Sequence, residues 1–161
     1  MALQAGYHQR CPTATFSAFI DRSPCLDKPL DDVRGYAHEL AWSLVDDYDA
    51  KAVVVASRSV EHHERIQAEA EEFDGAVESV ALDVREPDQV HAAARGVLER
   101  YGKIDVLVNN AAGNFVCPAA KMSPRAWRAV LGIVLDGTFY CSRSFGKPML
   151  AARSGRILNV V

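Results

Sequence analysis

The 161-residue sequence lacks the marks of several common protein classes. Lysine and arginine number 18 against 21 acidic residues, and the formal net charge of −3 offers no basic footprint for nucleic acid. No apolar stretch approaches the roughly 20 residues that a membrane-spanning helix needs. The first residues show no basic segment followed by an apolar one, which a secretory signal would have. We therefore expect a cytoplasmic protein that binds neither nucleic acid nor a membrane.

Cysteine is sparse and irregularly placed. The four cysteines form no C-x-x-C pair and have no regular spacing, which disfavours a metal site or a disulfide framework. Free thiols in a reducing compartment are the favoured interpretation. The run His62-His63-Glu64 does not match a metal-binding motif either, so we expect no bound metal.

Glycine is absent where a dinucleotide site normally needs it. Such a site usually has a glycine-rich turn after the first strand, where the pyrophosphate lies against a helix N-terminus. Before Ala52 the chain has only Gly6 and Gly35, which are not spaced for that role. Asp31 and Asp32, at the start of the first predicted helix, would repel a phosphate. No diphosphate cradle is therefore predicted.

From residue 31 onward, helical and strand patterns alternate along the chain. Apolar residues at three- and four-residue steps predict helices over 33–48, 60–73 and 87–101, and a longer one from Ser123-Pro124 toward Pro148. Continuous β-rich runs predict strands over 52–56, 77–84, 106–108 and 156–161. We predict an α/β fold with a doubly wound, Rossmann-like parallel sheet, incomplete at both ends.

Residues 1–30 differ from the rest of the chain. They are rich in proline, serine, threonine and cysteine and show no clear periodicity, so an irregular N-terminal arm is predicted. Within it, the segment from Thr15 to Ile20 has a composition compatible with one strand. Residues 31–161 are predicted to form a partial dinucleotide-binding domain.

Small and polar residues follow the predicted strand at 106–108. Asn109 and Asn110 precede Ala111-Ala112-Gly113 at the carboxyl end of that strand, which is where ligands bind in open α/β sheets. A flat cofactor approaches the backbone closely only where side chains are small. An ordinary strand-to-helix turn is the alternative interpretation, because these residue types are common in turns.

Two other predicted strand ends carry polar residues. Ser57 and Arg58 follow the strand at 52–56, where an arginine suits the 2′-phosphate of NADP. A surface arginine is the alternative. Asp83 lies near the end of the next strand, where it would meet an adenine amino group or simply cap a turn.

Four motifs, in this order, resemble the short-chain dehydrogenase/reductases. They are Ala-Ser-Arg-Ser (56–59), Leu-Asp-Val (82–84), Asn-Asn-Ala-Ala-Gly (109–113) and Gly-Arg-Ile-Leu-Asn-Val (155–160). Within that family, Asn-Ala-Ala-Gly-Asn-Phe (110–115), Cys117-Pro118 and Asp136-Gly137-Thr138-Phe139 are similar to the 2,4-dienoyl-CoA and trans-2-enoyl-CoA reductase branch. The resemblance covers roughly residues 37–161.

The resemblance implies an NADPH-dependent enzyme that reduces unsaturated fatty acyl-CoA thioesters and, in the family, forms homo-oligomers. It assigns the 2′-phosphate to Ser57 and Arg58 and the adenine to Asp83 and Val84. It also assigns the ribose and nicotinamide to Asn110, Ala111, Ala112 and Gly113. Asn114 matches an asparagine near the thioester carbonyl, where it would stabilise the enolate that hydride addition forms.

Two departures from the family pattern indicate a truncated and inactive form. Unrelated sequence replaces the family's first strand and its Thr-Gly-x-x-x-Gly-x-Gly turn before about residue 37, and no Tyr-x-x-x-Lys occurs. The alternative hypothesis is a non-catalytic binding or assembly module. On that hypothesis the long helix exposes apolar area at Trp127, Leu131, Phe139 and Phe145.

Overall fold

The computed structural model describes residues 50, 52–58, 64, 68, 77–113 and 117–160, together with the backbone of a strand at Thr15–Phe19. The predicted helix over 33–48 lies outside the described residues. So does most of the predicted helix over 60–73, of which only Glu64 and Ala68 are described, both helical.

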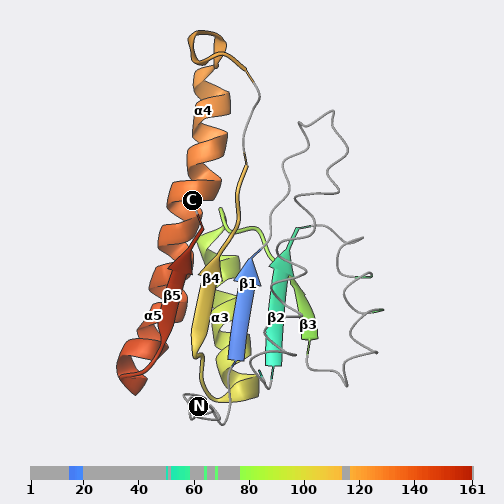
Figure 1. The fold of residues 1–161 in the computed structure, drawn as a ribbon, viewed down its shortest axis with the longest axis vertical. Coiled ribbons are helices and arrows are strands. Elements are labelled where there is room, and N and C mark those ends of the chain that lie inside the picture. Colours follow the sequence, from blue (N-terminus) through green and yellow to red (C-terminus); the bar gives the residue numbers. More distant parts are fainter. Residues whose placement is uncertain are drawn as a thin grey trace, which may run out of the picture.

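The described residues form a five-stranded parallel sheet (Figure 1). Its spatial order is β3-β2-β1-β4-β5. The strands are β1 (Thr15–Phe19), β2 (Ala52–Ser57), β3 (Val77–Ala81), β4 (Val106–Asn109) and β5 (Arg156–Asn159). The order reverses direction between β1 and β4, which creates a topological switch point at their carboxyl ends. The predicted α/β class with a Rossmann-like sheet is confirmed.

The central strand comes from the segment that was predicted to be an irregular arm. β1 pairs with β2 on one side and with β4 on the other, with Phe16 beside both Val53 and Val106. The strand prediction for the segment starting at Thr15 is confirmed. Unrelated sequence thus forms a strand at this place, because backbone pairing accepts any β-compatible sequence.

Helices and turns begin and end where local signals predict. The helix α3 (Pro87–Tyr101) has proline in its first turn and ends at Gly102, whose φ of 75° is left-handed. A short 3-10 turn at Ala119–Lys121 precedes α4 (Pro124–Leu131), and Ser123 caps α4 by accepting a hydrogen bond from the Ala126 amide at 3.1 Å. The chain continues through a π-helical segment (Gly132–Gly137) into α5 (Thr138–Ala152).

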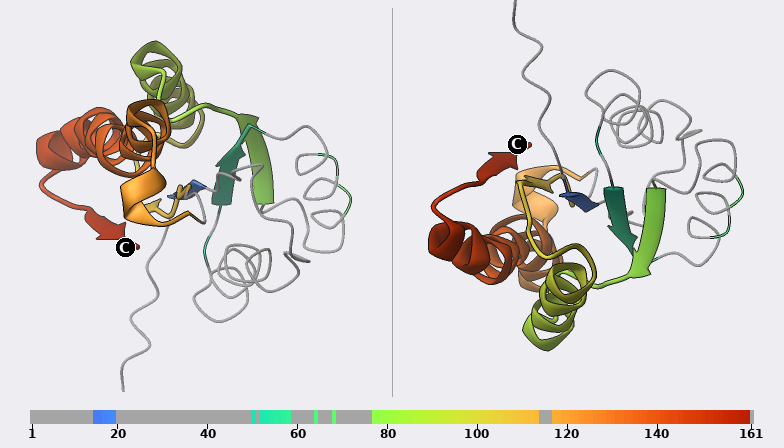
Figure 2. Two further views of the ribbon diagram at one scale, coloured as in Figure 1. Left: turned by 90° about the horizontal axis from the view of Figure 1, so that it is seen from above. Right: turned by 90° about the horizontal axis from the view of Figure 1, so that it is seen from below.

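The core lies between the sheet and one layer of helices. α3 and α5 pack against each other on the same face of the sheet (Figure 2). The buried side chains of this layer come from both helices and from the strands beneath them: Val54, Ala56, Val90, Ala94, Val97, Leu107, Cys141, Phe145 and Met149. Phe145 is only 1% exposed, so its predicted exposure is wrong. The cause is that α5 turns this face toward β4 and α3.

The strand predicted over 77–84 is shorter in the structure. β3 ends at Ala81, and Val84 and Arg85 form a turn. The Asp83 carboxylate accepts a hydrogen bond from the Arg85 amide at 3.0 Å, and the Asp83 carbonyl accepts one from the Glu86 amide at 3.1 Å. These local bonds replace strand pairing, which is the usual effect of an aspartate at a turn.

The π-helical segment lets the long helix approach the turn after β3. A β-carbon built on Gly137 would lie 2.7 Å from Cγ2 of Val84, which is buried and β-branched. Only glycine therefore fits at this contact. Within the described ranges, no helix has both the length and the apolar character that crossing a membrane requires.

Replacing Gly137 by alanine should destabilise the protein. The added methyl group would overlap the rigid Val84 side chain, and overpacking of this kind costs about 1–3 kcal/mol. Gly96→Ala is the matched control, because a β-carbon on Gly96, inside α3, meets nothing within 4 Å. Urea unfolding should show a lower midpoint for G137A and an equal or higher one for G96A. Equal midpoints for G137A and the unchanged chain would contradict the contact.

Candidate cofactor site

The polar residues predicted at the strand ends meet at one edge of the sheet. β2 ends at Ser57, and the Leu82 amide donates a hydrogen bond to the Ser57 carbonyl at 2.9 Å. This bond holds the turn that carries Asp83 beside Arg58. On the other side of β1, the loop that starts at Asn110 leaves the carboxyl end of β4.

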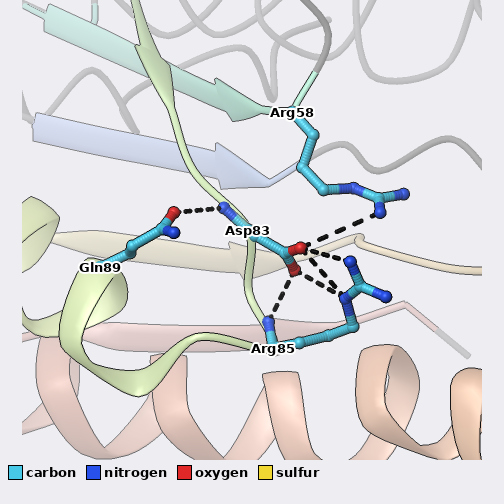
Figure 3. A network of polar contacts seen from close by, with 4 residues as sticks. All are labelled: Arg58, Asp83, Arg85 and Gln89. Atoms are coloured by element: carbon cyan, nitrogen blue, oxygen red, sulfur yellow. Dashed lines mark hydrogen bonds and ion pairs between the residues drawn. The ribbon is translucent and has the colours of Figure 1, made fainter.

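Two arginines converge on the Asp83 carboxylate (Figure 3). Arg85 Nε donates to Oδ1 at 2.9 Å and to Oδ2 at 3.1 Å, and Arg85 Nη2 also donates to Oδ2. Arg58 Nη1 lies 3.9 Å from Oδ2. The structure thus brings the predicted residues Arg58 and Asp83 together, and it adds Arg85, which the sequence analysis missed.

The surroundings of Asp83 favour its charged form. The hydrogen bonds from Arg85 hold the pKa of the Asp83 carboxyl below its ordinary value, with a further contribution from the positive charge of Arg58, although partial burial opposes the shift. The Asp83 amide donates to Oε1 of Gln89 at 3.1 Å, which ties the turn to the first turn of α3. Both the backbone and the carboxylate of Asp83 are therefore fixed.

The other predicted residues of this part of the edge differ in accessibility. The Ser57 side chain is buried, whereas Arg58 is half-buried and reaches the surface. Val84 is buried against Gly137, so its side chain packs into the core. A ligand at this edge would accordingly meet the guanidinium of Arg58, and Val84 only through its backbone.

The loop after β4 is built of small side chains. Asn110, Ala111 and Gly113 are half-buried and Ala112 is exposed. Asn114, the predicted catalytic residue, lies outside the described residues. Small side chains next to a topological switch point leave room for a flat ring beside the backbone, which fits the cofactor interpretation of this loop.

A part-buried cluster of two amides and a hydroxyl joins β4, β5 and α5. Asn109 Nδ2 donates to Oδ1 of Asn159 at 2.8 Å and to Oγ of Ser142 at 3.1 Å. Asn109 is 4% exposed, and its Oδ1 has no hydrogen-bond partner among the described residues. The sequence signal for this cluster is the pair Asn109 and Asn159, which the parallel register of β4 and β5 places side by side.

The donors at this edge fit a phosphorylated nucleotide. Arg58 offers a permanently charged planar fork, and the preceding residue, Ser57, carries a hydroxyl. Arg58 and Arg85 bring two positive side chains to the single carboxylate of Asp83. The positive charge of Arg58 suits an anionic group at the end of β2. The small side chains of residues 110–113 leave room for a flat ring at the end of β4.

A parallel sheet with this strand order and these carboxyl-end loops defines a Rossmann-like α/β protein. The chain belongs to the short chain dehydrogenase family, which it matches over residues 33–161. β1 lies before that range and completes the same sheet. The resemblance read from the four motifs is confirmed.

Several relatives bear on the function. The chain is 38% identical over 109 residues to a probable 2,4-dienoyl-CoA reductase of Bacillus subtilis, which covers 67% of this chain and 43% of that protein. A short chain dehydrogenase structure from Bacillus anthracis is 33% identical with a TM-score of 0.76, covering 92% and 56% of the two chains. A metagenomic short-chain oxidoreductase solved in complex with NADP is 31% identical with a TM-score of 0.72, covering 89% and 60%. The chain thus spans less than two thirds of each of these relatives.

Acidification should remove the stabilisation that Asp83 provides. Because the pKa of Asp83 is lower in the folded than in the unfolded chain, its contribution is present above the ordinary aspartate range and is lost as pH falls through the folded value. Asp83→Asn should therefore lower the free energy of unfolding near neutral pH, and the difference should shrink below about pH 4. Urea unfolding at several pH values measures this difference in the free energy of unfolding.

Glu99→Gln is the matched control for that experiment. Glu99 is an exposed carboxylate on α3 whose contact with Arg95 spans 3.7 Å, and exposed pairs of this kind contribute little to stability. The E99Q difference should be small at every pH tested. A D83N difference that stays constant from neutral to acidic pH would contradict the ion cluster.

Proposed function

We propose that the chain provides the cofactor-binding part of an oxidoreductase that reduces unsaturated fatty acyl-CoA thioesters with NADPH. The substrate is a 2,4-dienoyl-CoA or a 2-enoyl-CoA. The observation that carries the proposal is the cationic cluster of Arg58, Asp83 and Arg85 at the edge of a short chain dehydrogenase sheet. The identity to a probable 2,4-dienoyl-CoA reductase supports the substrate class.

The cofactor is proposed to lie along the carboxyl edge of the sheet. Its 2′-phosphate binds to Arg58 and Ser57, and its adenine lies beside the turn of Asp83 and Val84. The ribose and nicotinamide lie against the small loop of residues 110–113. A relative that binds NADP supports this choice, and NADPH when bound supplies the hydride for the reduction.

Asn114 is proposed to contact the thioester carbonyl of the substrate. Its side-chain amide donates a hydrogen bond where negative charge develops as the enolate forms. Loss of one such donor costs about 2.7–4 kcal/mol in well-studied oxyanion holes. The sequence contains no Tyr-x-x-x-Lys to supply a proton, so we propose that the 161-residue chain by itself has negligible turnover.

Nucleotide binding tests the proposal directly. The purified chain should bind NADPH more tightly than NADH, because only NADPH carries the 2′-phosphate. Arg58→Gln should lower the NADPH affinity by about tenfold or more, since hydrogen bonds to charged groups contribute about 1.5–3 kcal/mol. Titration of the nucleotide fluorescence measures both affinities, and NADPH oxidation with a 2,4-dienoyl-CoA should stay at background.

Arg95→Gln is the matched control, because it removes one positive charge from the exposed face of α3. It should leave the preference for NADPH intact. Equal affinities for NADPH and NADH in the unchanged chain would overturn the cofactor assignment. Clear turnover of the dienoyl-CoA would overturn the proposal that the chain by itself is inactive.

An assembly module remains a second candidate function, favoured by exposed apolar side chains on the long helix. Trp127 is 54% exposed, Leu135 61%, Phe139 58% and Leu150 81%. Leu131 is only half-buried, so of the predicted set only Phe145 belongs to the core. Exposed apolar area of this extent marks an interaction surface.

Size-exclusion chromatography with light scattering tests the assembly hypothesis. The chain should run as an oligomer, and Phe139→Glu should lower its mass by placing a charge on the exposed apolar face. His91→Glu is the control, because His91 is an exposed residue of α3 and belongs to neither α4 nor α5. A monomer at all concentrations would exclude self-assembly through this face.

A further inference from the structure

A groove lies between α5 and β5, which run side by side at one edge of the described sheet (Figure 1). Its volume is about 770 Å³, within the range of about 300–1,000 Å³ that is usual for ligand sites. The connection from α5 to β5 lines it, so it extends to the amino-terminal end of β5. The candidate cofactor site lies at the opposite, carboxyl end of the strands, and none of its described residues lines the groove.

Apolar side chains make up part of the lining of this groove. Leu150 on α5 is 81% exposed, and Ile157 on β5 is 42% exposed. Gly146 lets the two elements approach each other, because a β-carbon at that residue would lie 3.5 Å from Cδ1 of Ile157. Covering exposed apolar area is favourable by about 25 cal/mol per Å². The groove therefore favours a ligand that brings apolar groups of its own.

Positive side chains line the same groove. Arg143, Lys147 and Arg153 are all exposed, and no described acidic residue lines the groove with them. Within the part of the chain that the structure describes, none of the three makes an ion pair or a side-chain hydrogen bond. Arg143, Lys147 and Leu150 follow each other at four- and three-residue steps, so they share one face of α5.

The surrounding sequence has the same sign of charge. The charged residues of positions 123–161 are a single acid, Asp136, and the basic residues Arg125, Arg128, Arg143, Lys147, Arg153 and Arg156. The whole chain, in contrast, has 21 acidic and 18 basic residues. Two copies that met through this groove would bring like charges together, which is unfavourable. Charge complementarity therefore favours an acidic partner over a second copy of the chain.

We propose that the groove between α5 and β5 docks an acidic peptide segment of a partner protein. The apolar side chains of that segment contact Leu150 and Ile157, and its carboxylates face Arg143, Lys147 and Arg153. These three cations are spread over about 15 Å of the helix axis, which suits several carboxylates along a peptide better than one small anion. The docking surface is independent of the proposed cofactor site.

Selection from a random peptide library displayed on phage tests the proposal without assuming a partner. The full chain is the target, and the selected peptides are then synthesised and titrated in solution by fluorescence anisotropy. The peptides should combine apolar residues with several aspartates or glutamates, and their affinity should fall as the salt concentration rises. Selection of peptides without acidic residues would overturn the proposal, and so would failure to select any peptide that competes for the groove.

Charge reversal shows whether the selected peptides bind at the groove. Lys147→Glu should weaken their binding by about tenfold or more, because it places a carboxylate opposite theirs. Arg128→Glu is the matched control, since Arg128 is exposed on α4 and does not line the groove. Peptides with lysine in place of their acidic residues should bind K147E more tightly than they bind the unchanged chain. Equal effects of K147E and R128E would contradict the assigned site.

A second pair of variants tests the apolar contact. Leu150→Ser should weaken peptide binding several-fold, whereas Leu135→Ser should not, because Leu135 is 61% exposed but does not line the groove. Both side chains are mostly exposed, so neither change should prevent folding. An L150S variant that binds the peptides as tightly as the unchanged chain does would overturn the role of the groove.

A membrane surface is the outcome that would replace a protein partner, because anionic lipids also attract exposed basic and apolar side chains. Sedimentation with vesicles of phosphatidylcholine and phosphatidylserine, in a ratio of about 3:1, tests it. The chain should stay in the supernatant. Binding to the vesicles that K147E abolishes and R128E preserves would assign the groove to a membrane and overturn the proposal.

Discussion

Backbone pairing on both sides of β1 is the constraint on which the placement of Ser57, Arg58 and residues 110–113 depends. Phe19, the last residue of β1, is in register with Ala56 on β2 and with Asn109 on β4. Ser57 and Asn110 follow those partners by one residue each. Parallel pairing therefore brings the end of β2 and the loop after β4 to the same edge, on either side of one strand. Without β1, the two halves of the site would have no common scaffold.

The turn after β3 is held both by this sheet and by the long helix. The Leu82 amide bonds to Ser57, which aligns the turn with the end of β2. Gly137 lets the π-helical segment reach Val84 from the other side. Asp83 lies between these two anchors, so its carboxylate has little freedom to leave Arg85. A rigid carboxylate costs less conformational entropy when a ligand binds beside it.

Much of the fold was predictable because its signals are local. The run of β-branched residues at 52–56, the glycine after Tyr101 and the cap at Ser123 each act within a few residues, and the structure confirms the elements that they predict. The place of β1 was not predictable in this way. A short strand is selected by its pairing with segments distant in sequence, and Thr15–Phe19 has no periodicity that reveals those partners.

The candidate site, too, was predictable only where its sequence signals are local. Arg58, Asp83 and the loop at 110–113 were predicted because they follow strand ends, and the structure brings Arg58 and Asp83 within 3.9 Å. Arg85 was missed because its role depends on the turn, which ends β3 earlier than the predicted strand. Phe145 was placed wrongly because the apolar stripe of the long helix gives no sign of which part faces α3.

The hydrogen bonds of Asn109 connect the carboxyl end of β4 to β5 and α5. A buried amide oxygen without a partner is unfavourable, so the orientation of Asn109 must come from the two bonds that its Nδ2 donates. Those bonds reach β5 and α5, and the Asn109 carbonyl also accepts from the Val160 amide at 3.0 Å. The backbone that leads into Asn110 is thus held by β5 and α5 as well as by β1. The position of the small loop therefore depends on the packing of α5, the helix that continues from the contact between Gly137 and Val84.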